Sequence, residues 1–195
     1  MNKKMKNRIN FSDIMKLTFL FVMAFSAMNV NAQSKYFTRE GNIMFHSDAP
    51  MEKIEAKNNK VSSAIDAGTG KIEFIVLIKS FHFEKALMQE HFNENYMESD
   101  KFPKSTFVGT ITNLKDINWA KEGSYKVNVK GKLTIHGITK DVASTGTIKV
   151  TKGGLNVNNT FKVALADYGI EIPSVVKEKI SKEVDVTVNS DYKAI

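Results

Sequence analysis

The sequence feature that most constrains the fold is a long alternation of apolar and polar residues between Ser124 and Val150. From Tyr125 to Ile135 the apolar side chains fall on alternate positions. Successive strand side chains point to opposite faces, so this run predicts a strand with one apolar face. A second alternation follows a His-Gly pair, and two such runs joined by a short glycine-containing segment predict an antiparallel hairpin. A one-faced hairpin is unstable alone in water, so the rest of the chain must supply more strands and a cover for the apolar face.

Similar spacing recurs along the rest of the chain. It predicts strands at 36–47, 71–83, 105–114, 155–165 and 183–189, with two weak short strands in 53–66, where the alternation is poor. About eight strands with hairpin connections and no strand–helix–strand pattern predict an all-β fold, namely an eight-stranded antiparallel up-and-down barrel. The interior of such a barrel is just large enough for side chains or for one small or narrow ligand.

One segment departs from the strand spacing. Residues 84–97 are rich in helix formers and acids. Intervals of three and four residues separate Leu87, Met88, His91 and Phe92. This pattern predicts a short helix that lies over one end of the barrel.

The first 32 residues have the organisation of a secretory signal peptide. Residues 1–16 carry five basic residues against one acid, residues 17–28 are uncharged and mostly apolar, and Ala32 ends a small-residue cleavage motif. The apolar run of about a dozen residues is shorter than the roughly 20 that a membrane-spanning helix needs. We therefore expect a signal peptide at 1–32, one domain at 33–195, and a mature protein in the periplasm or outside the cell.

The charge and the cysteine content of the chain limit the classes of binding partner that we expect. The formal net charge is +7, and the five bases and one acid of residues 1–32 account for most of it, which leaves no basic stripe on the mature chain. A nucleic-acid partner is therefore not expected. The chain has no cysteine, which excludes disulfides, thiolate metal sites and a lipid-modified cysteine, so we expect no stable membrane anchor.

Three motifs resemble the YceI-like family. They are HFNENYMESDKFPKSTF at 91–107, GKLTIHGITKDV at 131–142 and ALADYGIEIPSVV at 164–176. Family members carry a similar H-F … F/Y-P-x-x-x-F segment and a G-x-L-T-I-H-G-x-T-K hairpin, and the resemblance covers essentially all of 33–195. Residues 53–66 depart from the family pattern, because many relatives have a strand pair that contains glycine and phenylalanine there.

This resemblance implies an extended, lipocalin-like barrel that is secreted to the periplasm and holds an isoprenoid or other amphiphilic lipid in its lumen. It also implies a binding or carrier protein and not an enzyme. We therefore expect the partner to be an isoprenoid, a quinone or a fatty-acyl lipid.

The strand alternation nominates the side chains that would line such a lumen. If one face of every strand points inward, the strand residues of the lining set are Phe74, Val76, Phe107, Ile111, Tyr125, Val127, Val129, Leu133, Ile135 and Phe161. Three residues of the helical segment, Met88, Phe92 and Tyr96, would close one end. Burying a lipid tail against them would be favourable by roughly 25 cal/mol per Å² of apolar surface removed from water, so few polar contacts are needed. The alternative is that these side chains fill the barrel as an ordinary core.

Two histidines, His91 and His136, lie inside the family-like motifs. We expect them to hold the helix end and the hairpin turn by hydrogen bonds, with contact to a lipid head group as the alternative. Lys140, together with Lys132 and Lys101, is a candidate to bind the phosphate head group of a lipid at the barrel mouth. The alternative is that these lysines belong to a solvated face. The four histidines of the chain do not have metal-ligand spacing, so no metal or cofactor is expected.

Three classes of function remain open on the sequence. The first is a secreted lipid-binding protein, and the second is a stress-response or interaction protein with a filled barrel and a functional outer surface. The third is a lipid-modifying enzyme, but no nucleophile motif, P-loop or pair of carboxylates nominates a catalytic residue. We therefore expect a binding protein without a catalytic residue, and the sequence leaves open whether it forms a homodimer.

Overall fold

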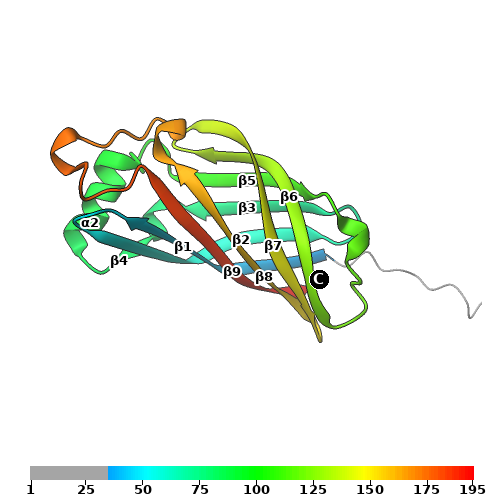
Figure 1. The fold of residues 1–195 in the computed structure, drawn as a ribbon. Helices are drawn as coiled ribbons and strands as arrows, with labels where there is room; N and C mark the ends of the chain where they lie inside the picture. Colours follow the sequence, from blue (N-terminus) through cyan, green and yellow to red (C-terminus); the bar gives the residue numbers. More distant parts are fainter. Residues whose placement is uncertain (1–34) are drawn as a thin grey trace, which may run out of the picture. The chain divides into compact units, whose positions relative to one another are not determined.

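Eight long strands make up most of the described part of the chain. The computed structural model describes residues 35–195, so the expected signal peptide lies outside them. The strands are β1 Lys35–Asp48, β2 Lys53–Asp66, β3 Lys71–Leu77, β5 Lys104–Ile111, β6 Gly123–Ile135, β7 Ile138–Thr151, β8 Gly154–Ala164 and β9 Glu183–Ala194. They pair antiparallel in the order β1-β9-β8-β7-β6-β5-β3-β2, and β1 also pairs with β2, which closes the barrel (Figure 1). The expected eight-stranded antiparallel barrel is confirmed.

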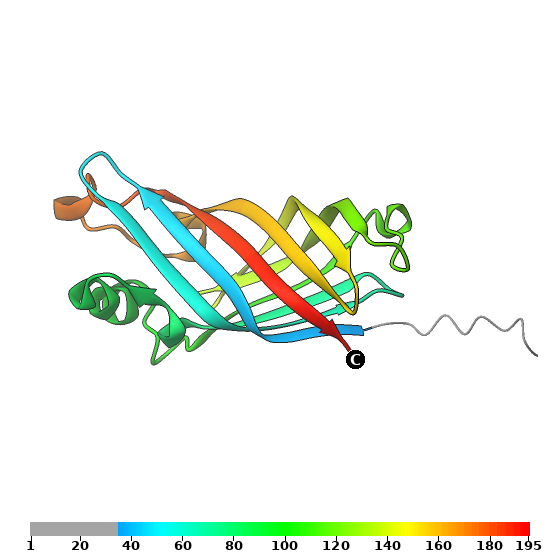
Figure 2. The same ribbon diagram turned by 90° about the horizontal axis from the view of Figure 1, so that it is seen from below.

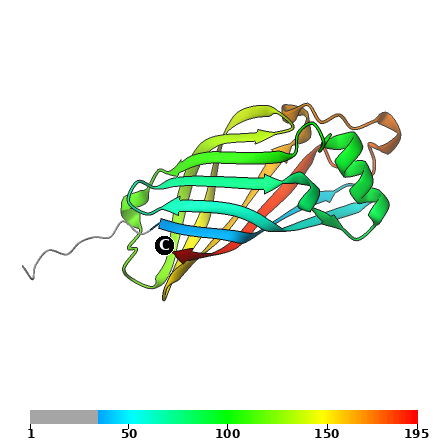
Figure 3. The same ribbon diagram turned by 180° about the vertical axis from the view of Figure 1, so that it is seen from behind.

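Short elements complete the described chain. The two-residue strand β4, His82–Phe83, pairs with β2. The helix α2, Ala86–His91, continues into the π-helical η2, Phe92–Tyr96, and both lie over one end of the barrel, as expected (Figure 3). The 3-10 helices are η1 Ile78–Ser80, η3 Leu114–Asp116, η4 Leu165–Tyr168 and η5 Ser174–Val176. Within residues 35–195, no helix has the length and apolar character needed to cross a membrane.

The segment 53–66 forms a single strand of 14 residues, so the expectation of two short strands is wrong. The poor alternation has a physical cause, which is a bulge. Ile43 lies opposite Asn58 while Gly41 lies opposite Val61, so β2 has one extra residue between these pairs, and its inward face shifts by one position. Asn58 is fully buried here, and its amide donates to a β3 carbonyl and accepts from a backbone N–H of β2, both at 2.9 Å.

The apolar run 71–83 is interrupted in the structure. β3 ends at Leu77, and η1 and β4 follow in place of a continuous strand. Phe74 and Val76 face the interior, whereas Ile75 and Leu77 are about half exposed on the outer face. The strand therefore lines the cavity with one face and leaves the other partly exposed.

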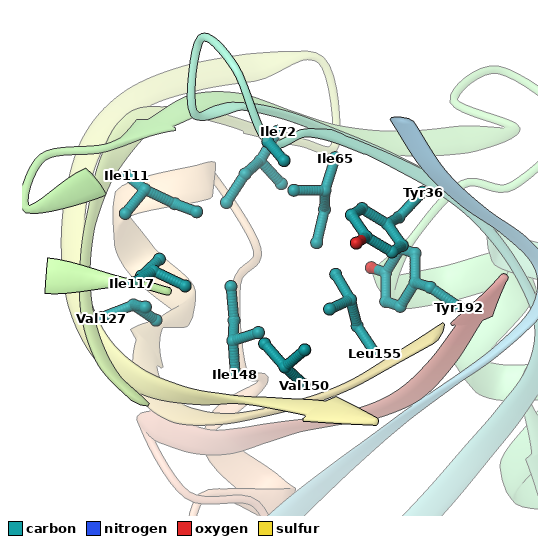
Figure 4. Packing of buried hydrophobic residues seen from close by; sticks show 11 residues of the cluster. Tyr36, Ile65, Ile72, Ile111, Ile117, Val127, Ile148, Val150, Leu155 and Tyr192 are labelled. Atoms are coloured by element: carbon teal, nitrogen blue, oxygen red, sulfur yellow. The ribbon is translucent and has the colours of Figure 1, made fainter. Parts of the chain in front are cut away.

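At one end of the barrel, apolar side chains from several strands point inward and pack into one buried cluster (Figure 4). Ile148 and Leu155 are 1% and 2% exposed. The loop between β5 and β6 covers them with Ile117, and the Trp119 ring stacks on Tyr36 with a centroid distance of 5.9 Å. We call this region the packed end, and its buried residues are Tyr36, Ile65, Ala67, Ile72, Ile111, Ile117, Val127, Ile148, Val150, Leu155 and Tyr192.

Candidate ligand-binding site

The other end of the barrel is hollow. A cavity of about 750 Å³ extends from the packed end to α2 and η2. Around this end lie α2 and η2, the tip of the β1–β2 hairpin, and the segment 165–182 (Figure 2). The volume falls within the roughly 300–1,000 Å³ that is usual for small-molecule sites. We call this region the hollow end.

The wall of the cavity is almost wholly apolar and rich in aromatic rings. Phe92 of η2 packs against Phe45, Phe81 and Phe83 with ring centroids 5.0 to 5.6 Å apart. Phe74 and Phe107 face the cavity from β3 and β5, with centroids 6.4 Å apart. Aromatic side chains offer large apolar surfaces with little conformational freedom, so this wall suits an extended apolar chain.

Eleven of the thirteen residues nominated as lining line this cavity, and Ile111 and Tyr125 do not. Ile111 is 2% exposed within the packed end, and Tyr125 packs against the same end, where its hydroxyl donates to the Lys121 carbonyl at 3.0 Å. The alternation predicts the inward face of a strand but not how far along it the filling extends. The eleven, whose contact with a ligand stays a prediction, are Phe74, Val76, Met88, Phe92, Tyr96, Phe107, Val127, Val129, Leu133, Ile135 and Phe161.

Of the three head-group candidates, only His91 lines the cavity. His136 lies in the β6–β7 turn, with Nε2 2.9 Å from a Glu98 carboxylate oxygen and Nδ1 3.2 Å from the Tyr168 carbonyl oxygen. Both ring nitrogens are therefore engaged within the protein, as expected for a residue that holds the turn. Lys140 is exposed and outside the cavity lining, because it lies near the β6–β7 turn in the part of β7 that has separated from β8.

Charged side chains that no motif marks lie at the mouth of the cavity. Glu52, Lys85, Lys162 and Lys179 come from the β1–β2 turn, the start of α2, β8 and the segment 165–182. Lys85 Nζ lies 3.1 Å from a Glu52 carboxylate oxygen, and Lys162 Nζ lies 3.0 Å from one of Asp185. Lys85 and Glu52 are 33 residues apart in sequence, so only the folded barrel brings this pair together.

The barrel wall opens between β7 and β8. Their backbone pairing stops at Gly146 and Asn159, and beyond that point each strand is paired only with its other neighbour. The exposed residues Ala143 and Lys162 line the cavity together with inward-facing ones. The cavity therefore reaches the surface through a lateral gap, and η4 bounds this gap where it contacts β7.

The interior of the cavity contains few ionisable side chains. Burial raises the pKa of the Tyr96 phenol above its ordinary value, so at physiological pH this side chain is a neutral hydroxyl. In the part of the chain that the structure describes, no three His, Asp or Glu side chains are gathered as a metal site would require. The arrangement is that of an apolar binding site with few polar contacts.

The fold resembles several solved structures. A polyisoprenoid binding domain from Saccharophagus degradans implicated in plant cell wall breakdown has a TM-score of 0.72 at 16% identity, over 83% of this chain and 98% of that chain. BcnA from Burkholderia cenocepacia has a TM-score of 0.64 at 17% identity, over 77% and 95%. The YceI protein of Campylobacter jejuni has a TM-score of 0.55 at 19% identity, over 70% and 82%.

Sequence comparison gives the family. No curated protein sequence shows a significant match to the chain. The model of the YceI-like domain, in contrast, matches residues 25–192, which is most of the chain. The chain therefore belongs to the YceI-like domain family.

Proposed function

We propose that this chain is a lipid-binding protein that holds an isoprenoid, a quinone or a fatty-acyl lipid in the cavity of the hollow end. The observation that carries the proposal is the cavity itself, with about 750 Å³ bounded by aromatic and aliphatic side chains. Protein interiors are normally close-packed, and an empty apolar space forfeits dispersion contacts. A tightly packed barrel that leaves one end hollow is best accounted for by a ligand.

Apolar burial supplies the affinity in this proposal. A tail enclosed between Phe92, Phe107 and Phe161 would gain roughly 25 cal/mol per Å² of apolar surface removed from water. The similarity to the polyisoprenoid binding domain of Saccharophagus degradans supports an isoprenoid as the first ligand to test.

The two other classes of function fit the structure less well. An interaction protein with a filled barrel agrees with the packed end but not with the hollow one. For an enzyme, a nucleophile beside a base would be needed, and no motif in the chain nominates either residue. The proposal is therefore a non-enzymatic binding protein.

Mass spectrometry of an organic extract tests the proposal. The mature protein would be purified from its native source without detergent, and a heat-denatured, washed sample would serve as the control. We expect an isoprenoid, quinone or fatty-acyl species in about stoichiometric amount. An empty extract, combined with no uptake of added isoprenoid, would contradict the proposal.

We also propose that residues 1–32 direct secretion and are removed. N-terminal sequencing of the protein recovered from the periplasmic and culture fractions should then begin at Gln33. A chain that retains Met1 and stays in the cytosolic fraction would contradict this part of the proposal.

A further inference from the structure

The inward face of β8 carries one polar side chain, Asn159, among apolar ones. Leu155 and Val157 precede it and pack at the packed end, while Phe161 and Val163 follow it and pack at the hollow end. Asn159 itself lines the cavity. It therefore lies at the floor of the cavity, where the filled part of the barrel gives way to the hollow part.

Gly146 makes room for this side chain. It lies directly opposite Asn159 on β7, at the last backbone pair of the two strands. A Cβ at this position would come within 2.9 Å of Asn159 Nδ2 and within 2.6 Å of the Asn158 carbonyl oxygen. Because the glycine lacks that atom, the amide can lie against β7 and reach Ser144, where Nδ2 donates to Oγ at 2.9 Å.

The Asn159–Ser144 pair leaves hydrogen-bonding capacity unused. Asn159 Oδ1 is buried, and no donor within residues 35–195 reaches it. The Ser144 hydroxyl accepts from the amide, which leaves its own proton to donate. If the amide is turned over, Ser144 donates to Oδ1 and an amide N–H is left instead, so either orientation offers one donor and one acceptor. Buried polar groups are normally paired, so the floor is suited to a ligand group that completes both bonds.

No ionic partner is available to this pair from the neighbouring strand positions. Asp141 and Lys162 are the charged residues nearest in sequence; both are exposed, and Lys162 also lines the cavity. Asp141 pairs with Lys132 and Lys162 pairs with Asp185, each at 3.0 Å. A phosphate or carboxylate ion held against Asn159 Oδ1 would meet an acceptor and gain no counter-charge from these neighbours, which is unfavourable. The floor therefore selects an uncharged group.

We propose that Asn159 and Ser144 form a hydrogen-bonding site for the uncharged hydroxyl or carboxamide group of a lipid that binds head first. The site presupposes the proposed lipid-binding function and adds the class of head group and the orientation of the ligand. A hydroxyl or a primary amide both donates and accepts, so it completes the two bonds that the pair leaves open. The tail then runs past Phe161 toward the Phe92 cluster at the mouth.

Three matched probes test this site in the delipidated mature protein. They are geranylgeraniol, the hydrocarbon that lacks its hydroxyl, and geranylgeranyl diphosphate, each titrated by isothermal calorimetry. We expect the alcohol to bind about tenfold more tightly than the hydrocarbon, because completing a hydrogen bond to the buried Asn159 Oδ1 is worth about that factor. The diphosphate should bind most weakly.

Two variants and one control test whether Asn159 and Ser144 cause the preference for the alcohol over the hydrocarbon. In Asn159→Leu the preference for the alcohol should disappear while the hydrocarbon still binds, and in Ser144→Ala it should fall by about threefold. Asn156→Leu alters an outward-facing asparagine of the same strand, bonded to Asn189 and Asp191, and should keep the full preference. The ligand-free Asn159→Leu variant should also melt no lower than the wild type, because leucine removes an unpaired buried carbonyl.

The outcomes separate this site from the proposed function. Equal affinity for alcohol and hydrocarbon, tighter binding of the diphosphate, or a preference that survives Asn159→Leu would overturn the floor site and leave lipid binding intact. Failure of all three probes to bind the wild type, combined with an empty organic extract, would overturn the proposed function, and the floor site with it.

Discussion

The packed end and the hollow end of this barrel are built from the same eight strands with the same alternation of side chains, yet they differ in what fills them. At the packed end, Ile148 and Leu155 are almost completely buried, and Ile117 and Trp119 close the barrel from the β5–β6 loop. At the hollow end, rings such as Phe92 lie along the wall and leave about 750 Å³ between them. The alternation therefore determines which side chains face inward. The elements that close each end determine whether those side chains pack against one another across the interior.

Strand pairing accounts for part of this difference. Near the packed end, β7 and β8 are fully paired, but beyond Gly146 and Asn159 they separate. β3 also ends at Leu77, and η1 and β4 replace a continuous strand on that side. Both interruptions lie on the side of the cavity, where the wall is no longer a continuous sheet and the side chains leave open space.

The largest expected effect comes from removing the same side chain at each end. Leu155 and Leu133 are both buried, at 2% and 8% exposure, but Leu155 lies in the packed end and Leu133 lines the cavity. Leu155→Ala should lower the free energy of unfolding by about 2–5 kcal/mol, because it opens a void in a close-packed region. Leu133→Ala should cost clearly less, since one side of this leucine already faces open space.

Urea denaturation of the ligand-free proteins measures this pair of variants. The two midpoints should differ while the dependence on denaturant stays the same, which shows that stability alone has changed. Equal losses in the two variants would contradict the distinction between the ends.

A charge placed in the hollow end should abolish lipid binding. Val129→Arg puts a guanidinium into the cavity wall, where it must either displace the tail or lose its hydration, so affinity for an isoprenoid should fall by roughly a hundredfold or more. Val108→Arg is the matched control on the neighbouring strand, because Val108 is half exposed on the outer face. Calorimetric titration of both folded variants gives the comparison, and full lipid binding by Val129→Arg would show that the cavity is not the binding site.

Sequence alone predicts the barrel, the inward faces of several strands and part of the cavity wall. Val127, Val129 and Leu133 share one face of β6, and strand geometry requires this from their spacing alone. Phe45 lies in β1, where the register shifts between Thr38 and Ile43 and apolar residues stand on consecutive positions, so the alternation there does not single it out. Ile111 and Tyr125 could not be separated from the lining set, because their position relative to the filled end depends on strand register.

The polar parts of the site could not be predicted for a different reason. Asn159 and Ser144 meet only because β7 and β8 pair in one register with Gly146 opposite Asn159. Lys85 and Glu52 are 33 residues apart and come together through the β1–β2 turn and the start of α2. Local patterns give the direction of a side chain, whereas such contacts depend on the whole topology.

A buried hydroxyl at the packed end gives a smaller effect, of about 1 kcal/mol. Tyr192 is 3% exposed and donates to Ser63 Oγ at 2.7 Å, and Tyr192→Phe removes this bond while Ser63 keeps its bond to the Glu73 carbonyl. Lipid affinity should not change, because Tyr192 lies outside the cavity lining. A loss of affinity in this variant would mean that the two ends are not independent.

The same residue predicts a dependence on alkaline pH. Burial raises the pKa of the Tyr192 phenol well above its usual value of 10.0. Below pH 10 the folded and unfolded chains both keep this proton, so its contribution to stability is fully present. Above pH 10 the unfolded chain loses the proton and the folded chain keeps it, so the free energy of unfolding falls, by up to about 1.4 kcal/mol per pH unit. Denaturation curves measured from pH 8 to 11 give the free energy of unfolding at each pH. This free energy should fall more steeply with rising pH for the wild type than for Tyr192→Phe.

The smallest effect is expected at the β6–β7 turn, close to the hollow end but outside its lining. His136 has a backbone φ of +49°, which asparagine tolerates well, so His136→Asn should keep the turn. It loses the contact with the Glu98 carboxylate, which is 44% exposed, and we expect a cost of at most about 1 kcal/mol. Lipid affinity should stay within about twofold, because hydrogen bonds within the protein occupy both ring nitrogens of the wild-type histidine. A tenfold loss of affinity, with stability unchanged, would instead assign His136 to the head group and extend the binding site beyond the hollow end.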